Sequence, residues 1–157
     1  GNMEKERVLG MYFIDRSKLE RHLLYMDGLL QQVEHLPLSS WQEKMALERT
    51  TQMIIESIID VGNMMIDGFI MRDPGGYEDI IDILVDEKVL EEKDSDSFKA
   101  VLHLRKQLVR DYLNINHDEL KRVLKENWTA LEKFTEQVRT YLNNELGVYT
   151  AFKPEDK

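Results

Sequence analysis

The stretch between residues 41 and 69 places the strongest constraint on how this chain can fold. Its apolar residues recur at three- and four-residue spacing, which predicts one long helix with two neighbouring apolar faces. The first face comprises Leu47, Ile54, Ile58, Val61 and Met65, and the second comprises Met45, Ile55, Ile59, Ile66 and Phe69. Ser40 and Glu43 have the spacing of a capping box, so the helix is expected to begin at Trp41. A helix that is apolar on two faces lies at the centre of a bundle or meets a second subunit.

Amphipathic segments on both sides of this stretch predict further helices. Asp15 is the expected N-cap of a helix over residues 16–36, and the Asp73–Gly76 turn precedes a short helix over residues 77–88. A helix over residues 98–113 follows, and Asn116 caps a last helix that runs to residue 146 and ends at Gly147. We therefore expect an all-α fold, an antiparallel bundle of four to five helices.

The length of 157 residues fits one domain. Residues 15–147 are expected to form this helical domain, residues 1–14 a loosely ordered N-terminal extension, and residues 148–157 a C-terminal tail. No signal peptide or membrane span is recognisable, so a cytoplasmic protein without a membrane partner is expected. The absence of cysteine excludes disulfides and thiol nucleophiles. The four histidines form no pair with metal-ligand spacing, and no glycine-rich phosphate loop follows a strand, so we expect neither a metal nor a cofactor.

Charge is distributed unevenly along the chain. The net charge of −9 argues against broad nucleic-acid binding, and DNA is not an expected partner. Residues 73–96 carry ten acidic side chains against two lysines, whereas residues 98–125 carry seven lysines and arginines against three acidic side chains. The basic segment is either an ordinary solvated surface or a local site for a nucleotide or a short phosphodiester.

Arg105 stands inside the apolar stripe of the 98–113 helix, three residues after Leu102 and three before Leu108. A buried guanidinium needs a carboxylate or a cleft, because an unpaired buried charge is costly. The 41–69 helix carries a polar strip from which Asp60 or Asp67 is the expected partner of Arg105.

Residues 104–112, LRKQLVRDY, resemble a degraded copy of the signature of HepT-like proteins of the HEPN superfamily, Arg-x4-His-x-Tyr. Arg105, the Leu108–Val109 pair and Tyr112 match this signature, and residues 60–74 are typical of one bacterial HepT-like subgroup. The resemblance implies a helical homodimer in which the signature helices of two subunits build a composite cleft. Active members are similar to metal-independent endoribonucleases, and act as toxins paired with a minimal nucleotidyltransferase antitoxin. In some, the partner attaches AMP to the motif tyrosine, which here corresponds to Tyr112.

The sequence departs from the signature at two positions. Arg110 stands where the histidine is expected, and Lys106 stands where an asparagine usually follows the first arginine. Arginine remains protonated at every relevant pH, so Arg110 can bind phosphate but cannot act as a general base. Two other histidines could supply the base: His117, six intervening residues after Arg110, or His103 beside Arg105.

These observations leave two main hypotheses open. The first is a HepT-like homodimer with lost or reduced ribonuclease activity that binds RNA or nucleotide, or acts as a regulatory module, through Arg105, Lys106 and Arg110. The second is an active metal-independent endoribonuclease. A purely structural helical dimer is a third alternative, and Tyr112 could equally be a core or interface residue. We expect dimerisation because the two-faced helix and the turn after it leave apolar residues that need cover, namely Met64, Met65, Ile70 and Met71.

Overall fold

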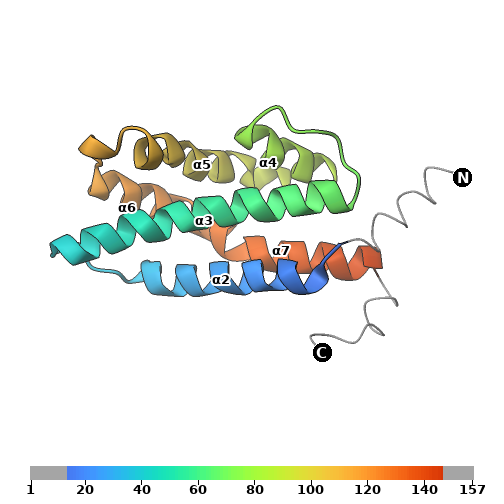
Figure 1. Ribbon diagram of the computed structural model, residues 1–157, viewed down its shortest axis with the longest axis horizontal. Coiled ribbons are helices and arrows are strands. Elements are labelled where there is room, and N and C mark those ends of the chain that lie inside the picture. Colours follow the sequence, from blue (N-terminus) through green and yellow to red (C-terminus); the bar gives the residue numbers. More distant parts are fainter. Residues whose placement is uncertain (1–13, 147–157) are drawn as a thin grey trace, which may run out of the picture.

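The protein is described here by a computed structural model that covers residues 14–146 (Figure 1). These residues form an all-α fold without strands, which confirms the predicted class. The helices are α2 (Arg16–Glu34), α3 (Trp41–Gly68), α4 (Tyr77–Asp86), α5 (Ser95–Val109), α6 (His117–Glu126) and α7 (Trp128–Leu146), with single 3₁₀ turns η1 (Glu92–Asp94) and η2 (Tyr112–Asn114). Residues 1–13 of the expected extension, the Gly147 stop and the 148–157 tail lie outside the described residues.

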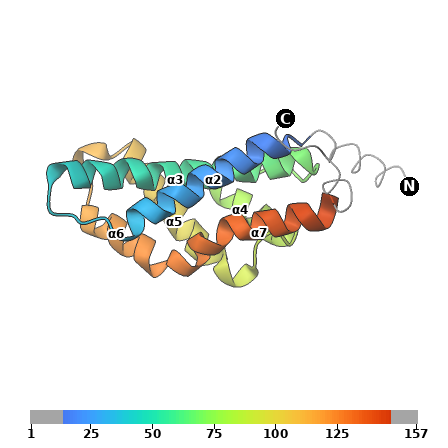
Figure 2. The same ribbon diagram turned by 90° about the horizontal axis from the view of Figure 1, so that it is seen from below.

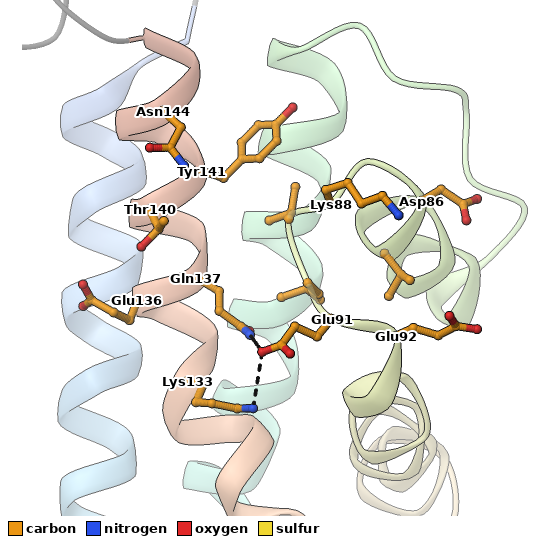
Figure 3. Close-up of a pocket in the computed structure, with 13 residues that line it drawn as sticks. Asp86, Lys88, Glu91, Glu92, Lys133, Glu136, Gln137, Thr140, Tyr141 and Asn144 are labelled. Atoms are coloured by element: carbon orange, nitrogen blue, oxygen red, sulfur yellow. Dashed lines mark hydrogen bonds and ion pairs between the residues drawn. The ribbon is translucent and has the colours of Figure 1, made fainter.

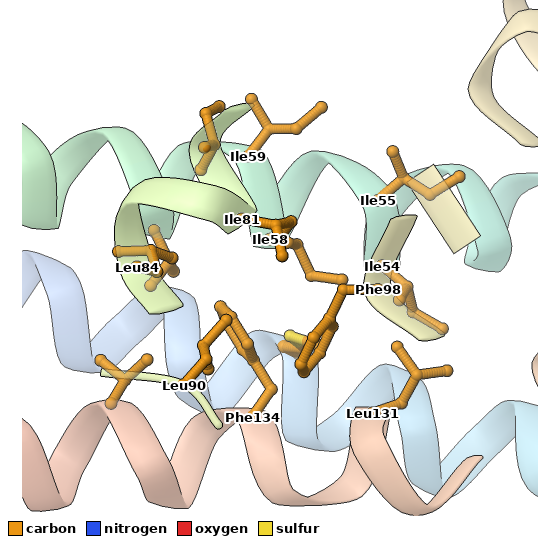
Figure 4. Close-up of a cluster of buried hydrophobic side chains, with 14 of the residues drawn as sticks. Ile54, Ile55, Ile58, Ile59, Ile81, Leu84, Leu90, Phe98, Leu131 and Phe134 are labelled. Atoms are coloured by element: carbon orange, nitrogen blue, oxygen red, sulfur yellow. The ribbon is translucent and has the colours of Figure 1, made fainter. Parts of the chain in front are cut away.

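Helix α3 lies at the centre of the bundle and contacts α2, α4, α5 and α6 (Figures 1 and 2). Both of its apolar faces are used: Ile54, Ile55, Ile58, Ile59 and Met65 are all buried. Figure 4 shows α3 meeting α4, α5 and α7 in one apolar cluster. Close packing against α4 depends on Gly62, because a Cβ there would collide with the Ile80 side chain. The expected central position of this helix is thus observed.

Side-chain caps fix the helix starts that the sequence predicts. Ser40 and Glu43 form the complete capping box: Ser40 Oγ accepts the Glu43 N–H at 3.1 Å, and Glu43 Oε1 accepts the Ser40 N–H at 2.9 Å. Asp15 Oδ1 accepts the Lys18 N–H at 2.8 Å, and Asn116 Oδ1 accepts the Glu119 N–H at 3.0 Å. These caps satisfy amide groups that a helix leaves unpaired at its start.

Two predicted helices depart most from the observed ones. Helix α5 ends at Val109, and the next residues turn into η2 instead of extending the helix to 113. In addition, α5 begins at Ser95, three residues before its predicted start, and α2 and α4 each end two residues early. The single last helix predicted over residues 117–146 is two helices that meet at Asn127, where the chain bends (Figure 2). The Asn127 side chain donates from Nδ2 to the Val123 carbonyl at 2.8 Å, and its own carbonyl accepts the Leu131 N–H at 3.2 Å. Its side-chain amide therefore helps to end α6 while its backbone begins α7.

The apolar residues that were expected to require a second subunit are mostly covered by the chain itself. Met65 is completely buried, and Met64 and Met71 pack partly against the core. Only Ile70, with 59% of its surface exposed, remains open. Met65 therefore needs no cover from a second subunit, contrary to the prediction. No helix in the 14–146 region is long and apolar enough to cross a membrane.

Candidate functional site

Helix α5 and the turn before α4 enclose a pocket of about 520 Å³. Four basic side chains of α5 and its C-cap line one side, and the start of α4 lines the other. The lining residues that matter here are His103, Arg105, Lys106 and Arg110 from the first group, and Tyr77, Glu78 and Asp79 from the second. The pocket thus collects four of the residues that the sequence singles out, and it is the candidate functional site.

Arg105 is held in this pocket by two contacts. Its Nε donates to Glu56 Oε1 of α3 at 2.7 Å, and its guanidinium carbon lies 4.7 Å from the centre of the Tyr77 ring, a cation–π contact. The hydrogen bond that Arg105 donates to Glu56 raises the pKa of Arg105, so the side chain stays charged. About a quarter of the Arg105 side chain, 27%, remains exposed.

The prediction that Asp60 or Asp67 pairs with Arg105 was wrong. Asp60 and Asp67 lie on the same helix as Glu56 but are exposed, and Arg105 pairs with Glu56 instead. Spacing along α3 identifies the polar strip, but the axial register between α3 and α5 decides which carboxylate meets the guanidinium. Tyr77 was not predicted as a site residue, because its only signal for such a place was its position directly after the Gly75–Gly76 turn.

Three of the basic side chains form a stripe along the outer face of α5. His103, Lys106 and Arg110 are exposed and follow one another at three- and four-residue spacing. Among the described residues, neither Lys106 nor Arg110 has an ion-pair partner. Arg105 is paired with Glu56, so Lys106 and Arg110 are the lysine and arginine of the pocket that have no ion-pair partner among the described residues.

The turn that carries Tyr77 is fastened by a bidentate ion pair. Arg72 Nη1 and Nη2 lie 2.7 and 2.9 Å from the two Asp79 carboxylate oxygens, and Asp79 Oδ2 also accepts the Gly75 N–H at 2.8 Å. The Arg72 bonds, followed by the Gly75 bond, lower the pKa of Asp79 to about 2. A lowered pKa means that this link is complete above the ordinary aspartate pKa of about 3.9 and is lost only as the pH falls towards 2. The Tyr77 side of the pocket therefore keeps its shape at neutral pH.

His117 and Tyr112 lie outside this pocket. His117 Nε2 lies 2.7 Å from Glu48 Oε2 of α3, and His117 lines a different pocket of about 600 Å³ with Lys44 and the 114–118 segment. Within one chain, then, Arg110 and His117 line separate pockets. Tyr112 sits on η2 with 63% of its surface exposed, so it is not a core residue of the chain.

A larger pocket lies elsewhere, between α7 and the segment that joins α4 to η1 (Figure 3). It encloses about 820 Å³, and its polar rim carries Asp86, Glu91, Glu92 and Glu136. Glu91 is engaged by Lys133 at 3.7 Å and by the Gln137 amide at 3.2 Å. Four carboxylates against Lys88 and Lys133 make this pocket less suited to a phosphate than the α5 pocket, where Arg105, Lys106 and Arg110 stand against two carboxylates. No cluster of three or more potential metal ligands occurs in residues 14–146.

Comparisons with known proteins identify the family to which the chain belongs. A family model described as "Ribonuclease HepT-like" matches residues 19–138. A Bacillus subtilis (strain 168) protein named "Putative RNase YutE" is 48% identical over 146 residues, which make up 91% of this chain and 100% of that protein.

Two solved structures resemble the fold. The "Structure of Cytosolic Protein of Unknown Function YutE from Bacillus subtilis" has a TM-score of 0.84 at 47% identity, and the match covers 89% of this chain and 99% of that one. A "Crystal structure of the toxin-antitoxin with AMP-PNP" has a TM-score of 0.67 at 16% identity, covering 76% of this chain and 96% of that one, and so shows a shared fold alone. The family match spans most of the chain, and a relative of similar length is nearly half identical. The chain therefore belongs to the HepT-like ribonuclease family, as its 104–112 segment indicates.

Proposed function

We propose that this protein is a homodimeric HepT-like module that binds single-stranded RNA or nucleotide at the α5 pocket, with lost or reduced ribonuclease activity. The observation that carries the proposal is the pair of cations without ion-pair partners in the described chain, Lys106 and Arg110, in a pocket beside Arg105. Arginine at position 110 supplies charge for a phosphate but no general base. A site with this composition favours binding over cleavage.

Arg105 can also contact a phosphate in its observed position. Glu56 occupies only the Nε side of the guanidinium, and within the described residues Nη1 and Nη2 make no hydrogen bond. The two terminal nitrogens form the edge that matches two oxygens of a phosphate. Glu56 thus orients the guanidinium while leaving its outer edge available.

A second copy of the chain is expected to pack near the C-terminal end of α5. Val109, Tyr112 and Leu113 expose 37%, 63% and 86% of their surfaces there, which is unusual for neighbouring large apolar side chains. A dimer through this region would bring two basic stripes together, as the family resemblance implies. Light scattering at micromolar concentration should return twice the chain mass of 18.6 kDa, and a mass of one chain would refute the dimer.

Salt-dependent binding tests the RNA proposal. The affinity for a short labelled single-stranded RNA should fall with rising salt, and each lost phosphate contact should reduce the slope of log affinity against log salt by about 0.7. We expect Lys106→Gln and Arg110→Gln each to cause such a reduction. Lys125→Gln, on the exposed face of α6, is the matched control and should leave the slope unchanged. The same salt slope in all three variants would contradict the proposed site.

Ribonuclease activity is the second candidate, and one placement favours it: His103 lines the same pocket as Arg105. The name of the B. subtilis relative points in the same direction. Cleavage of RNA in EDTA that is lost in both Arg105→Ala and His103→Gln would establish this activity. If cleavage is instead lost in Arg110→Ala and His117→Gln but kept in His103→Gln, the active site is formed by Arg110 and His117.

A minimal nucleotidyltransferase is the proposed partner, and Tyr112 is the proposed AMP acceptor. The exposed position of Tyr112 on η2 supports access by another protein. Intact-mass measurement after incubation with ATP and such a partner should show one added AMP that Tyr112→Phe does not receive. We place the protein in the cytoplasm, in line with the description of the YutE structure as cytosolic.

A further inference from the structure

Tyr77 is the one aromatic side chain among the residues that line the α5 pocket. It is the first residue of α4 and exposes 46% of its surface. The family signature does not include this position, and no function was predicted for it. Its surroundings nevertheless differ from those of an ordinary exposed tyrosine.

One side of the Tyr77 ring is occupied by the Arg105 guanidinium, 4.7 Å from the ring centre. Arg105 is itself fixed by Glu56, and the turn before Tyr77 is fixed by the Arg72–Asp79 pair. Two features therefore fix the ring: the backbone of the turn positions its Cα, and the Arg105 guanidinium packs on one face. Nearly half of the Tyr77 surface is still exposed, and Tyr77 lines the pocket.

The pocket has the size and the charge arrangement that a nucleotide requires. Its volume of about 520 Å³ lies within the range of about 300–1,000 Å³ typical of small-ligand sites. His103, Lys106 and Arg110 cover about 10 Å along the α5 axis, which is enough for consecutive phosphates of one strand. Proteins that bind single strands combine such a cationic track with aromatic rings on which bases stack.

We propose that Tyr77 is a base-stacking residue: it receives the base of the nucleotide whose phosphate binds Lys106 and Arg110. This inference rests on the proposed RNA- or nucleotide-binding function and adds to it a subsite for the base. Arg105 has two parts in this arrangement, since it supports one side of the ring and offers its Nη edge to phosphate. Stacking needs only a flat base, so the subsite accepts any of the four bases. Purines are favoured because their larger rings bury more area.

The test compares Tyr77 with a tyrosine of similar exposure on another surface. Tyr77→Ala should weaken binding of a short single-stranded oligoadenylate about 5- to 100-fold, the usual effect of replacing one base-stacking aromatic side chain by alanine. Tyr77→Phe keeps the ring and should bind like the parent protein. Tyr25→Ala, on α2 with 51% of the Tyr25 surface exposed, is the matched control and should leave the affinity unchanged.

An abasic ribose-phosphate oligomer of the same length separates stacking from an indirect effect through Arg105. If Tyr77 contacts the base, the parent and Tyr77→Ala bind the abasic oligomer equally, and both show the same salt slope. The opposite outcome is that Tyr77→Ala weakens binding of the abasic oligomer as well and lowers the slope of log affinity against log salt. In that case Tyr77 acts only by positioning Arg105, and the stacking inference is overturned. If the parent binds RNA but Tyr77→Ala binds it equally well, the inference fails while the proposed function stands. If the parent binds neither oligomer, the proposed function itself fails.

Discussion

Phe134→Ala is expected to lower the free energy of unfolding by about 3–5 kcal/mol, the largest effect of a single substitution that we anticipate in this protein. Phe134 of α7 and Phe98 of α5 are completely buried, and their rings meet edge to face with centres 5.6 Å apart (Figure 4). Truncation removes the ring contacts and leaves a cavity where α3, α4, α5 and α7 converge. Domains of this size are stable by only about 5–15 kcal/mol, so a large share of the stability would be lost.

Urea denaturation followed by circular dichroism measures this loss, and Phe134→Leu is the control. Leucine fills most of the same space, so its cost should stay below about 1.5 kcal/mol. A double-mutant cycle with Phe98→Leu should give a coupling of about 0.5–1.5 kcal/mol between the rings. A Phe134→Ala protein that loses less than about 1 kcal/mol would mean that the four helices do not depend on this cluster.

Arg139→Met is the second large effect, with an expected loss of about 2–3 kcal/mol of stability. Arg139 of α7 joins two carboxylates of α2: Nη2 lies 2.8 Å from Glu20 Oε2 and 3.0 Å from Asp27 Oδ2. Thr135 also donates to Asp27 Oδ1 at 2.6 Å. The hydrogen bond to Glu20 is the main reason that the pKa of Arg139 is raised. Removal of the guanidinium would leave two half-buried carboxylates side by side without their shared cation.

The exposed Arg122–Glu126 pair of α6 is the matched control for Arg139. It has a similar separation of 2.8 Å, but more than half of each side chain is exposed, 59% and 51%. Arg122→Met should therefore change stability by no more than about 0.5 kcal/mol. Adding Glu20→Gln to Arg139→Met should recover part of the loss, because it removes one of the two repelling charges. Equal losses for Arg139→Met and Arg122→Met would show that the α2–α7 network adds no more than a surface ion pair.

Local signals in the sequence were sufficient to predict three helix starts, those of α2, α3 and α6. Asp15, Ser40 and Asn116 act within four residues of themselves, and each makes the predicted cap. The break at Asn127 was not predicted, although this residue is the one polar member of an apolar seam. Asparagine occurs within helices as well as at their ends, and only the packing of α6 and α7 against different neighbours decides between these outcomes.

The candidate site was predicted only in part, for a related reason. The motif places Arg105, Lys106 and Arg110 on one helix, so their grouping follows from the chain itself. Glu56 and Tyr77 come from α3 and α4, and their approach to Arg105 depends on how three helices settle against one another. His117 shows the opposite case: it follows Arg110 closely in sequence, but the η2 turn carries it to Glu48 and into another pocket.

The acidic start of α4 has a consequence for the shape of any polyanion that this surface can accept. Glu78 lines the same pocket as Lys106 and Arg110, so negative charge borders the basic stripe directly. Asp79 lines it too, but its carboxylate is paired with Arg72. At physiological ionic strength, charges act on one another over about 8 Å, which is less than the width of a double helix. A duplex laid on the stripe would press its complementary strand against these carboxylates, whereas an unpaired strand would pass beside them. If the stripe binds RNA as proposed, repulsion from Glu78 favours one strand over a duplex, without any contact that reads the sequence of the bases.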